Sequence, residues 1–169
     1  MIINRTIFAP SVDSDMPAIR AVHARAFGRT IESDLTQHLI EGDNETIDLC
    51  ACIDSAIVGH CMLTELKGPD KAMALAPLAV DPNWRDYQIG TELVRQILTN
   101  ARDAGWKSVF VLGDPDYYGR FGFKSELADG VDCPYQGNAF QALELTPGSL
   151  SAYKGALTYP QAFGLVAAA

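Results

Sequence analysis

Apolar residues recur at intervals of three and four positions in three stretches of the chain, as they do along the buried face of an amphipathic helix. The predicted helices are residues 16–27, residues 31–41 and residues 91–104. Thr30 precedes the second stretch and offers a capping hydroxyl. A glycine follows each stretch (Gly28, Gly42 and Gly105), and glycine readily adopts the left-handed backbone that ends helices.

Runs of apolar and β-branched residues between these helices predict strands. The predicted strands are residues 5–9, 47–53, 56–66, 72–80, 108–112 and 140–145. The second and third are joined by Asp54 and Ser55, a short polar link typical of an antiparallel hairpin. Pro77 lies inside the fourth run, and because proline cannot donate to a ladder it predicts a bulge or a local break in pairing.

The centre of the chain alternates a strand, a loop, the long helix and another strand within residues 72–112. Two strands joined through one helix form a parallel pair with a right-handed crossover. A chain of 169 residues has the length of one compact domain. Residues 1–169 are therefore expected to fold as a single domain of mixed helices and strands.

The charge balance argues against nucleic acid and membranes as partners. Lys and Arg total 13 against 21 Asp and Glu, which gives a net charge of −8 and opposes attraction to polyanions. The chain shows no secretory leader pattern and no run near the roughly 20 apolar residues of a spanning helix, so we expect a cytoplasmic protein. An anionic ligand would need a local site made of backbone amides and one or two basic side chains.

The cysteines do not form a recognisable metal motif. They are Cys50, Cys52, Cys61 and Cys133. Spaced sets of Cys and His, which mark zinc sites, are missing from the chain. Cys50 and Cys52 share one face of their predicted strand by strand geometry alone. We expect reduced thiols and no bound metal.

Residues 80–91 lead from a buried strand to the N-terminus of the long helix. The first turn of a helix presents unpaired N–H groups and a partial positive charge, which together make an anion site. The loop contains neither the G-x-x-x-x-G-K-[ST] of a Walker loop nor the G-x-G-x-x-G of a dinucleotide turn, which argues against ATP and NAD. The alternative is an ordinary turn between a strand and a helix.

Two motifs resemble those of the GNAT acyltransferases, in particular a bacterial subgroup of predicted acetyltransferases. In the loop, Arg85-x-x-Gln88-x-Gly90 resembles the family's pyrophosphate motif Q/R-x-x-G-x-G/A, with Gln88 where the family usually has glycine. After the next strand, Tyr118-x-x-x-Gly122-Phe123 resembles the family's Y-x-x-x-G-F signature. The two motifs occur in the family's order and spacing.

The resemblance implies a single-domain GNAT fold over residues 4–150, followed by a C-terminal extension of residues 151–169. This fold is an α/β (α+β) arrangement in which about four helices flank a mixed, mostly antiparallel sheet of about six or seven strands. Its central parallel pair is splayed, and the resemblance places the thioester and the pantetheine arm of the cofactor against the strand that contains Pro77.

The resemblance also implies an acetyl-CoA-dependent N-acetyltransferase in which a primary amine attacks the thioester directly in a ternary complex. The residues it assigns to the cofactor are Leu78, Ala79, Val80, Arg85, Asp86, Tyr87, Gln88, Ile89, Gly90 and Thr91. Tyr118 matches the family's general acid. A phenol with a pKa near ~10 can give its proton to the CoA thiolate and stays neutral at pH 7.

The general base is left open, because residues 72–80, where many members of the family carry a carboxylate, contain no Asp or Glu. Glu65 and His60 are candidates. An exposed Glu at the end of a strand and a hydrogen-bonded core His are the ordinary alternatives. Asp114 precedes Pro115, a pattern typical of a capping carboxylate at a helix start.

A non-catalytic acyl-CoA-binding protein, acting as a sensor or a structural partner, is the alternative function. Gln88 and the missing carboxylate favour it, whereas Tyr118 favours an enzyme because a binding module needs no acid. The acceptor is left open between a small-molecule amine and a peptide or protein amine, which residues 28–34 and 125–139 would distinguish. The second of these segments could equally support a homodimer contact.

Overall fold

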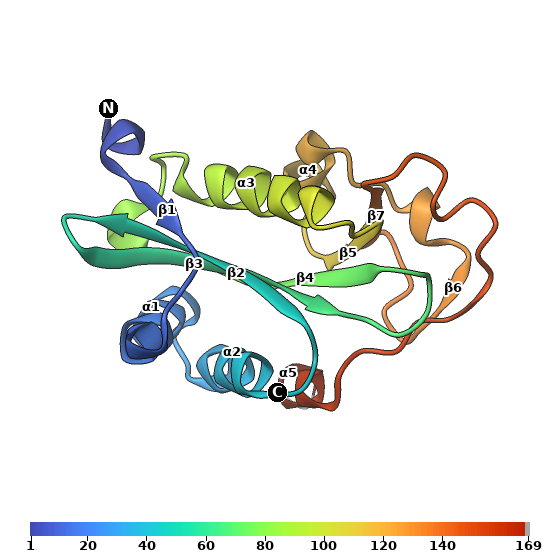
Figure 1. Ribbon diagram of the computed structural model, residues 1–169, viewed down its shortest axis with the longest axis horizontal. Helices are drawn as coiled ribbons and strands as arrows, with labels where there is room; N and C mark the ends of the chain where they lie inside the picture. The colour runs from blue at the N-terminus through green and yellow to red at the C-terminus, as the bar shows by residue number, and fades with distance from the viewer. Residues whose placement is uncertain (168–169) are drawn as a thin grey trace. The chain divides into compact units, whose positions relative to one another are not determined.

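The computed structural model describes residues 1–167, and these fold into two compact units. The first unit contains residues 1–63, 76–97 and 161–167, and the second contains residues 64–75 and 98–160. Figure 1 follows the chain from one terminus to the other. Strands β3 and β4 and helix α3 each contribute residues to both units.

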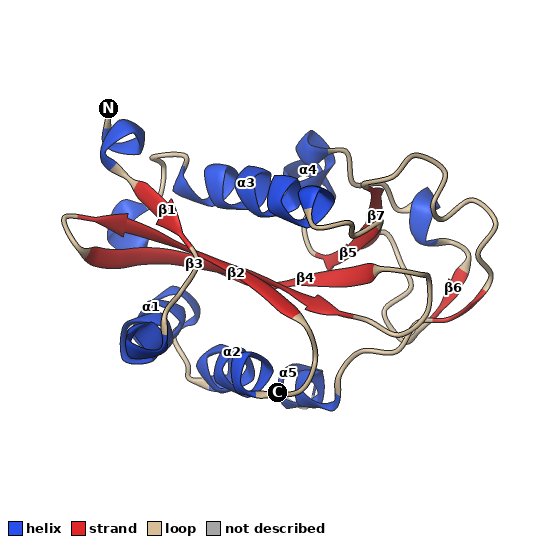
Figure 2. Cartoon of the chain, in the orientation of Figure 1, coloured by secondary structure: helices blue, strands red, loops and turns tan. Residues whose placement is uncertain are grey.

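Figure 2 shows where the helices and the strands lie. The helices are α1 (Met16–Phe27), α2 (Ile31–Glu41), α3 (Ile89–Asp103), α4 (Pro115–Tyr118) and α5 (Gly164–Ala167). The strands are β1 (Ile7–Ala9), β2 (Thr46–Ile53), β3 (Ala56–Glu65), β4 (Ala72–Val80), β5 (Ser108–Leu112), β6 (Val131–Asp132), β7 (Phe140–Glu144) and β8 (Gly155–Ala156). Six strands form a sheet in the order β1-β2-β3-β4-β5-β7, and β6 and β8 form a separate pair. The predicted mixed α/β fold, mostly antiparallel, is confirmed.

In the first unit, α1 and α2 cover one face of the strands and the start of α3 lies on the other face (Figure 1). The apolar positions that predicted these helices form the core: Ile19, Leu35 and Leu93 are each at most 2% exposed. Helix α1 has the predicted bounds. It ends because Gly28 adopts a left-handed backbone, with φ 69°, and its N–H returns to Ala24 O.

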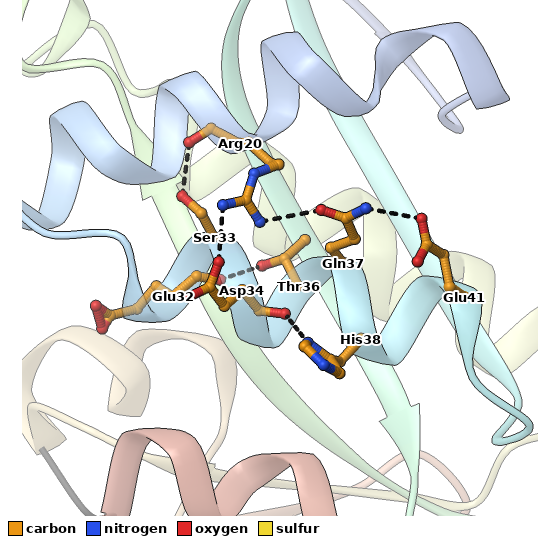
Figure 3. A network of polar contacts seen from close by, with 8 residues as sticks. All are labelled: Arg20, Glu32, Ser33, Asp34, Thr36, Gln37, His38 and Glu41. Carbon is orange, nitrogen blue, oxygen red and sulfur yellow. Dashed lines mark hydrogen bonds and ion pairs between the residues drawn. The ribbon is translucent and has the colours of Figure 1, made fainter.

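Polar side chains tie α1 and α2 together (Figure 3). The Arg20 guanidinium donates to Asp34 Oδ1 at 2.7 Å and to Gln37 Oε1 at 3.0 Å. Ser33 Oγ donates to Arg20 O at 2.7 Å. Thr30 occupies the N-cap position of α2 as predicted, but its side chain makes no capping hydrogen bond.

In the second unit, β5 lies between β4 and β7 and pairs with both. Its parallel ladder with β4 joins Ala72–Ala74 to Ser108–Phe110, and its antiparallel ladder with β7 runs along the whole of β5. Phe110 and Phe140 stack with ring centroids 5.7 Å apart, and both are fully buried. The central parallel pair predicted from the strand, helix, strand order is therefore present.

Strand β4 carries one residue more than β3 over the stretch in which they pair. Leu66 N donates to Ala72 O at 2.9 Å, and Asp81 N donates to Val58 O at 2.8 Å. From Val58 to Leu66 the chain advances eight residues, whereas from Ala72 to Asp81 it advances nine. Because bonds between antiparallel strands join opposed residues, β4 contains a bulge, as Pro77 predicts.

Two predicted boundaries are shifted by two residues, and several others by one. The first strand begins at Ile7 rather than at residue 5, because residues 2–5 form a 3-10 turn. Helix α3 begins at Ile89 rather than at Thr91. Residues 80–91 were expected to form the loop, yet a glycine such as Gly90 is tolerated in the first turn of a helix when the rest of the helix is strongly amphipathic.

Candidate active site

The loop of residues 81–88, hereafter the cofactor loop, begins at a buried aspartate that fixes its geometry. Asp81 is 7% exposed. Its N–H donates to Val58 O of β3, and its Oδ1 accepts from Asn83 N at 2.9 Å. Trp84 N donates back to Asp81 O at 2.8 Å, which closes a 3-10 turn. The loop therefore leaves β4 in a defined direction.

Helix α1 holds the cofactor loop through two further contacts. Arg25 Nε donates to Asp81 Oδ2 at 2.7 Å. Arg85 Nη2 donates to Ala26 O at 3.1 Å, in the last turn of the same helix. The guanidinium of Arg85 thus lies at the C-terminal end of a helix dipole, where a cation is favoured.

Two residues of the cofactor loop have a left-handed backbone although neither is glycine. Asp86 has φ 69° and Gln88 has φ 65°. A left-handed conformation costs a residue with a Cβ roughly 1–2 kcal/mol. Gln88 stands where the family motif has glycine, and its backbone takes the conformation that glycine adopts without strain. The loop therefore keeps the glycine geometry at an energetic cost.

Helix α3 presents an open N-terminus to the end of this loop. Glu92 N donates to Gln88 O at 3.0 Å as the first backbone bond of the helix. The amides of Ile89, Gly90 and Thr91 precede it and have no acceptor within the helix. The Ile89 side chain is 1% exposed, so it belongs to the core and offers only its backbone. This is the geometry of an anion site.

The other predicted cofactor residues lie at the end of β4, where burial alternates from residue to residue, or are exposed in the cofactor loop. Leu78 and Val80 are half-buried, whereas Ala79 between them is 2% exposed. Tyr87 is 46% exposed, with its ring centroid 6.1 Å from that of Trp84. All the predicted cofactor residues therefore belong to the first unit.

The predicted general acid lies in the second unit, at the end of α4. Asp114 caps this short helix, because its side chain accepts from Asp116 N at 2.9 Å, and the predicted cap is confirmed. The half-buried ring of Tyr118 meets that of Tyr117 edge-on with centroids 5.0 Å apart. Phe123 meets it edge-on from 5.8 Å. The phenol is thus oriented by an aromatic platform.

Gly113 makes the position of this ring possible. A Cβ added at Gly113 would lie 2.5 Å from Tyr118 Cε2 and 3.1 Å from its Cδ2. Such distances are far inside van der Waals contact, so any other residue would displace the ring. Sequence reasoning missed this role. The available signal was a glycine directly after a buried strand and a few residues before the tyrosine.

The two candidate bases differ in their surroundings. Glu65 is half-buried at the end of β3. His60 is fully buried, and its Nε2 lies 2.9 Å from Asp48 Oδ2 and its Nδ1 2.9 Å from His23 Nε2. Sequence reasoning missed Asp48 and His23. Their signal was a polar residue on the buried face of an apolar strand and of an apolar helix.

The electrostatics of this buried cluster follow from its contacts. Burial, and then the neighbouring His60, lower the pKa of His23 to about 3. Burial alone would raise the pKa of Asp48, but hydrogen bonds from His60 and Ser11 outweigh it and leave this pKa lowered. Burial and the nearby Asp48 raise the pKa of the Cys50 thiol. His23 is therefore neutral, Asp48 is a carboxylate and Cys50 is a thiol at pH 7.

A loop anion site before a long helix, and a tyrosine held on its own short helix, recur together in one known family. The sequence profile described as the Acetyltransferase (GNAT) family matches residues 16–123. The chain belongs to this family. Its members are acyltransferases, so the predicted enzyme class is confirmed.

Two relatives from Escherichia coli K12 are named as N-acetyltransferases. The chain is 35% identical over 144 residues to the uncharacterised N-acetyltransferase YjhQ, covering 80% of this chain and 79% of YjhQ. It is 31% identical over 155 residues to the uncharacterised N-acetyltransferase YhbS, covering 88% of this chain and 93% of YhbS.

Solved structures of this GNAT family share the fold. The crystal structure of Escherichia coli YhbS in complex with CoA matches with a TM-score of 0.88 and 28% identity, over 95% of this chain and 92% of YhbS. A GNAT acetyltransferase from Brucella melitensis in complex with acetyl-CoA matches with a TM-score of 0.80 and 26% identity, over 94% and 97% of the two chains. Within residues 1–167, no helix is long and apolar enough to cross a membrane.

Proposed function

We propose that this GNAT protein transfers the acetyl group of acetyl-CoA to a primary amine, by direct attack in a ternary complex. The observation that carries the proposal is the open start of α3 behind the cofactor loop, where the amides of residues 89–91 have no acceptor within the helix. The two relatives with solved structures were crystallised with CoA and with acetyl-CoA. The whole chain, residues 1–169, acts as one domain in this proposal.

The backbone of the cofactor loop holds the pyrophosphate in this scheme. Amides at a helix start bind phosphate with little help from basic side chains, which suits a protein whose net charge is −8. Arg85, Asp86, Tyr87 and Gln88 shape the loop, and Arg85 can add its guanidinium by leaving Ala26 O. The bulged strand at Leu78–Val80 offers backbone groups to the pantetheine arm and the thioester oxygen.

The chemistry needs two proton transfers. The amine nitrogen bonds to the acetyl carbon and loses a proton, while the carbon–sulfur bond breaks and the thiolate of CoA leaves. Tyr118 gives its phenolic proton to this thiolate. The aromatic platform and Gly113 support this role, because they fix the direction of the ring.

The acceptor is a primary amine of a small molecule or a peptide. The turn of residues 28–30 and the first residues of α2, up to residue 34, are proposed to border it in the first unit. Glu32 and Asp34 lie in the first turn of α2, but Arg29 pairs with Glu32 and Arg20 pairs with Asp34. This border therefore does not by itself select the charge of the acceptor.

Calorimetric titration with acetyl-CoA tests the cofactor site. Gly90→Asp places a carboxylate in the first turn of α3, a position where Asp is compatible with a helix, and it should weaken binding about 100-fold or more by repelling phosphate. Asn100→Asp adds the same charge to an exposed position further along α3 and should leave the affinity within about threefold. Equal losses in both variants, or no binding by the native protein, would overturn the proposal.

Release of free CoA thiol tests the transfer step. Acetyl-CoA is mixed with spermidine, kanamycin or a lysine peptide, three primary amines of different size. Release faster than hydrolysis with any of them supports transfer and gives the acceptor class. Tight binding of acetyl-CoA without release to any amine or to water contradicts the transfer step and leaves only the binding site standing.

A further inference from the structure

The fully buried side chains His23 and His60 form a hydrogen-bonded chain with Asp48 inside the first unit. Asp48 Oδ2 and His60 Nε2 are 2.9 Å apart, and His60 Nδ1 and His23 Nε2 are 2.9 Å apart. Both rings have no exposed surface. Three polar groups from β2, β3 and α1 are thus linked in one line inside the first unit.

The contacts assign the protons along this line. The Asp48 carboxylate can only accept, so His60 Nε2 carries a hydrogen and donates it. The neutral His60 ring then offers a lone pair at Nδ1, which accepts from His23 Nε2–H. The remaining nitrogen, His23 Nδ1, is left with a lone pair, and this buried atom has no hydrogen-bond partner among the described residues.

An unpaired buried lone pair at the end of such a chain is a proton acceptor. Leaving a buried polar atom without a partner costs roughly 1–3 kcal/mol, so its presence calls for a reason. A positive charge does not remain on His23, whose pKa is lowered by burial and by His60. It is better placed on His60, which faces the Asp48 carboxylate at 2.9 Å.

This line of hydrogen-bonded side chains lies beside β4, the strand proposed to carry the thioester. Asp81 N donates to Val58 O, so β3 and the end of β4 pair here. A Cβ added at Gly59 would lie 3.3 Å from Ala79 O. His60 follows Gly59, and its side chain points to the opposite face of β3, where α1 lies. At the other end, Phe27 lies parallel to the His23 ring and is 41% exposed.

A metal ion is a poorer explanation of the cluster. Ligand-type atoms of Asp48, Cys50 and His60 lie within 4.8 Å of one another. Both ring nitrogens of His60 already make hydrogen bonds, and a metal would have to break one of them. The Cys50 thiol has a raised pKa because of burial and Asp48, whereas a metal ligand must be a thiolate.

We propose that His23, His60 and Asp48 form the proton relay that accepts the proton lost by the acceptor amine. This inference rests on the proposed acetyl transfer. His23 Nδ1 is buried in this structure, so the proposal requires that binding of the acceptor opens a path to it. The proton released when the nitrogen bonds to the acetyl carbon then enters at His23 Nδ1, and His23 passes its Nε2 proton to His60 Nδ1. His23 ends as the neutral Nδ1–H tautomer and His60 as an imidazolium paired with the Asp48 carboxylate. No group is oxidised or reduced, and the relay as a whole takes up one proton.

The relay also supplies the base that β4 lacks. No Asp or Glu occurs between residues 72 and 80. In the relay, His23 receives the proton, and His60 and Asp48 act as positioning residues that fix the tautomer of His23 and stabilise the charge.

His23→Gln separates the relay from a structural role. The Gln amide can still donate to His60 Nδ1, but it offers no basic lone pair. We expect kcat with the fastest amine of the panel above to fall about 100-fold or more, while the KM and Kd for acetyl-CoA stay unchanged. His38→Gln is the matched control, because His38 is an exposed histidine on α2. An unchanged kcat in His23→Gln would overturn the relay.

Nitrogen-15 NMR of the imidazole rings tests the relay without an acceptor. The chain has 3 histidines, so the spectrum is simple. In the native protein we expect hydrogens on Nε2 of both His23 and His60 and none on Nδ1 of His23. A hydrogen on His23 Nδ1 at pH 7 would contradict the relay, since it could not accept another. Absent acetyl-CoA binding would instead contradict the proposed function, which this spectrum does not depend on.

Discussion

The cofactor loop and the platform around Tyr118 are built in opposite ways. The cofactor loop offers backbone amides, and its side chains from Arg85 to Gln88 are all exposed. The Tyr118 platform offers one side chain, whose ring is held by Tyr117, Phe123 and the bare backbone of Gly113. One site depends on backbone conformation and the other on the direction of a single ring.

This difference explains which substitutions each region accepts. Gln88 replaces a glycine in the cofactor loop, and the backbone still adopts φ 65°, so the amides of α3 remain open. A comparable replacement at Gly113 has no room, because the added atom would meet the Tyr118 ring. A site made of backbone tolerates changes of residue type, whereas a site made of one packed side chain does not.

The largest expected effect comes from the hydroxyl of Tyr118. Tyr118→Phe keeps the ring and its packing and removes only the proton donor, so kcat should fall by roughly 10²–10⁴. The Kd for acetyl-CoA should not change, because the proposed phosphate site is backbone in the other unit. Steady-state kinetics and calorimetry measure the two quantities separately. A large loss of affinity with normal kcat would reverse the assigned roles of the two regions.

The buried His23 of the first unit makes the stability of the fold depend on pH, an effect that the exposed cofactor loop does not predict. The folded state holds His23 at a pKa of about 3 against an ordinary 6.5, so the unfolded chain binds more protons between these values. Stability is therefore full above pH 6.5 and is lost as the pH falls. Between pH 6.5 and 4.5 the loss from His23 should be about 2 kcal/mol.

Urea denaturation at several pH values measures this loss. His23→Gln removes the titrating group, so its free energy of unfolding should fall less over the same pH range than that of the native protein. His38→Gln should retain the native slope, because His38 is exposed. Parallel curves for the native protein and His23→Gln would show that His23 does not titrate as its burial requires.

Sequence reasoning predicted the helices and strands, which depend on local periodicity, and missed contacts between polar residues that are distant in the sequence. The bounds of α1, β4 and β5 were predicted correctly because apolar spacing and flanking glycines are local signals. His23 was not recognised, since its significance comes from His60, which lies 37 positions away. Local patterns do not show which polar residues of two buried faces will meet.

The start of α3 shows the same limit within the candidate site. The loop was predicted to last to Thr91, but the helix begins at Ile89. The decisive feature is the left-handed backbone of Gln88, a conformation that glutamine rarely adopts and that no propensity predicts. The sequence therefore indicated the anion site but placed its boundary two residues late.

A smaller effect on activity is expected from Gly113→Ala. The new methyl group would lie 2.5 Å from Tyr118 Cε2, so the ring must move, and kcat should fall about 10-fold or more. The free energy of unfolding should fall by about 1–3 kcal/mol from overpacking. Gly119→Ala is the control, because nothing lies within 4 Å of its added atom. Equal kinetics in both variants would show that the ring position does not matter.

The smallest effect is expected at Gln88 itself. Gln88→Gly relieves the left-handed strain at φ 65° but makes the unfolded chain more flexible, so the net stabilisation should be about 0.5–1 kcal/mol. Affinity for acetyl-CoA should rise by no more than about threefold, because the backbone already has the required shape.

Asp86→Gly is the comparison variant, because Asp86 has the same left-handed backbone, with φ 69°, and its replacement also removes a negative charge. Its gain in affinity should be larger and should shrink in high salt, whereas that of Gln88→Gly should not. A tenfold or greater gain in Gln88→Gly, independent of salt, would mean that the glutamine side chain obstructs the phosphates and that side chains matter in the cofactor loop after all.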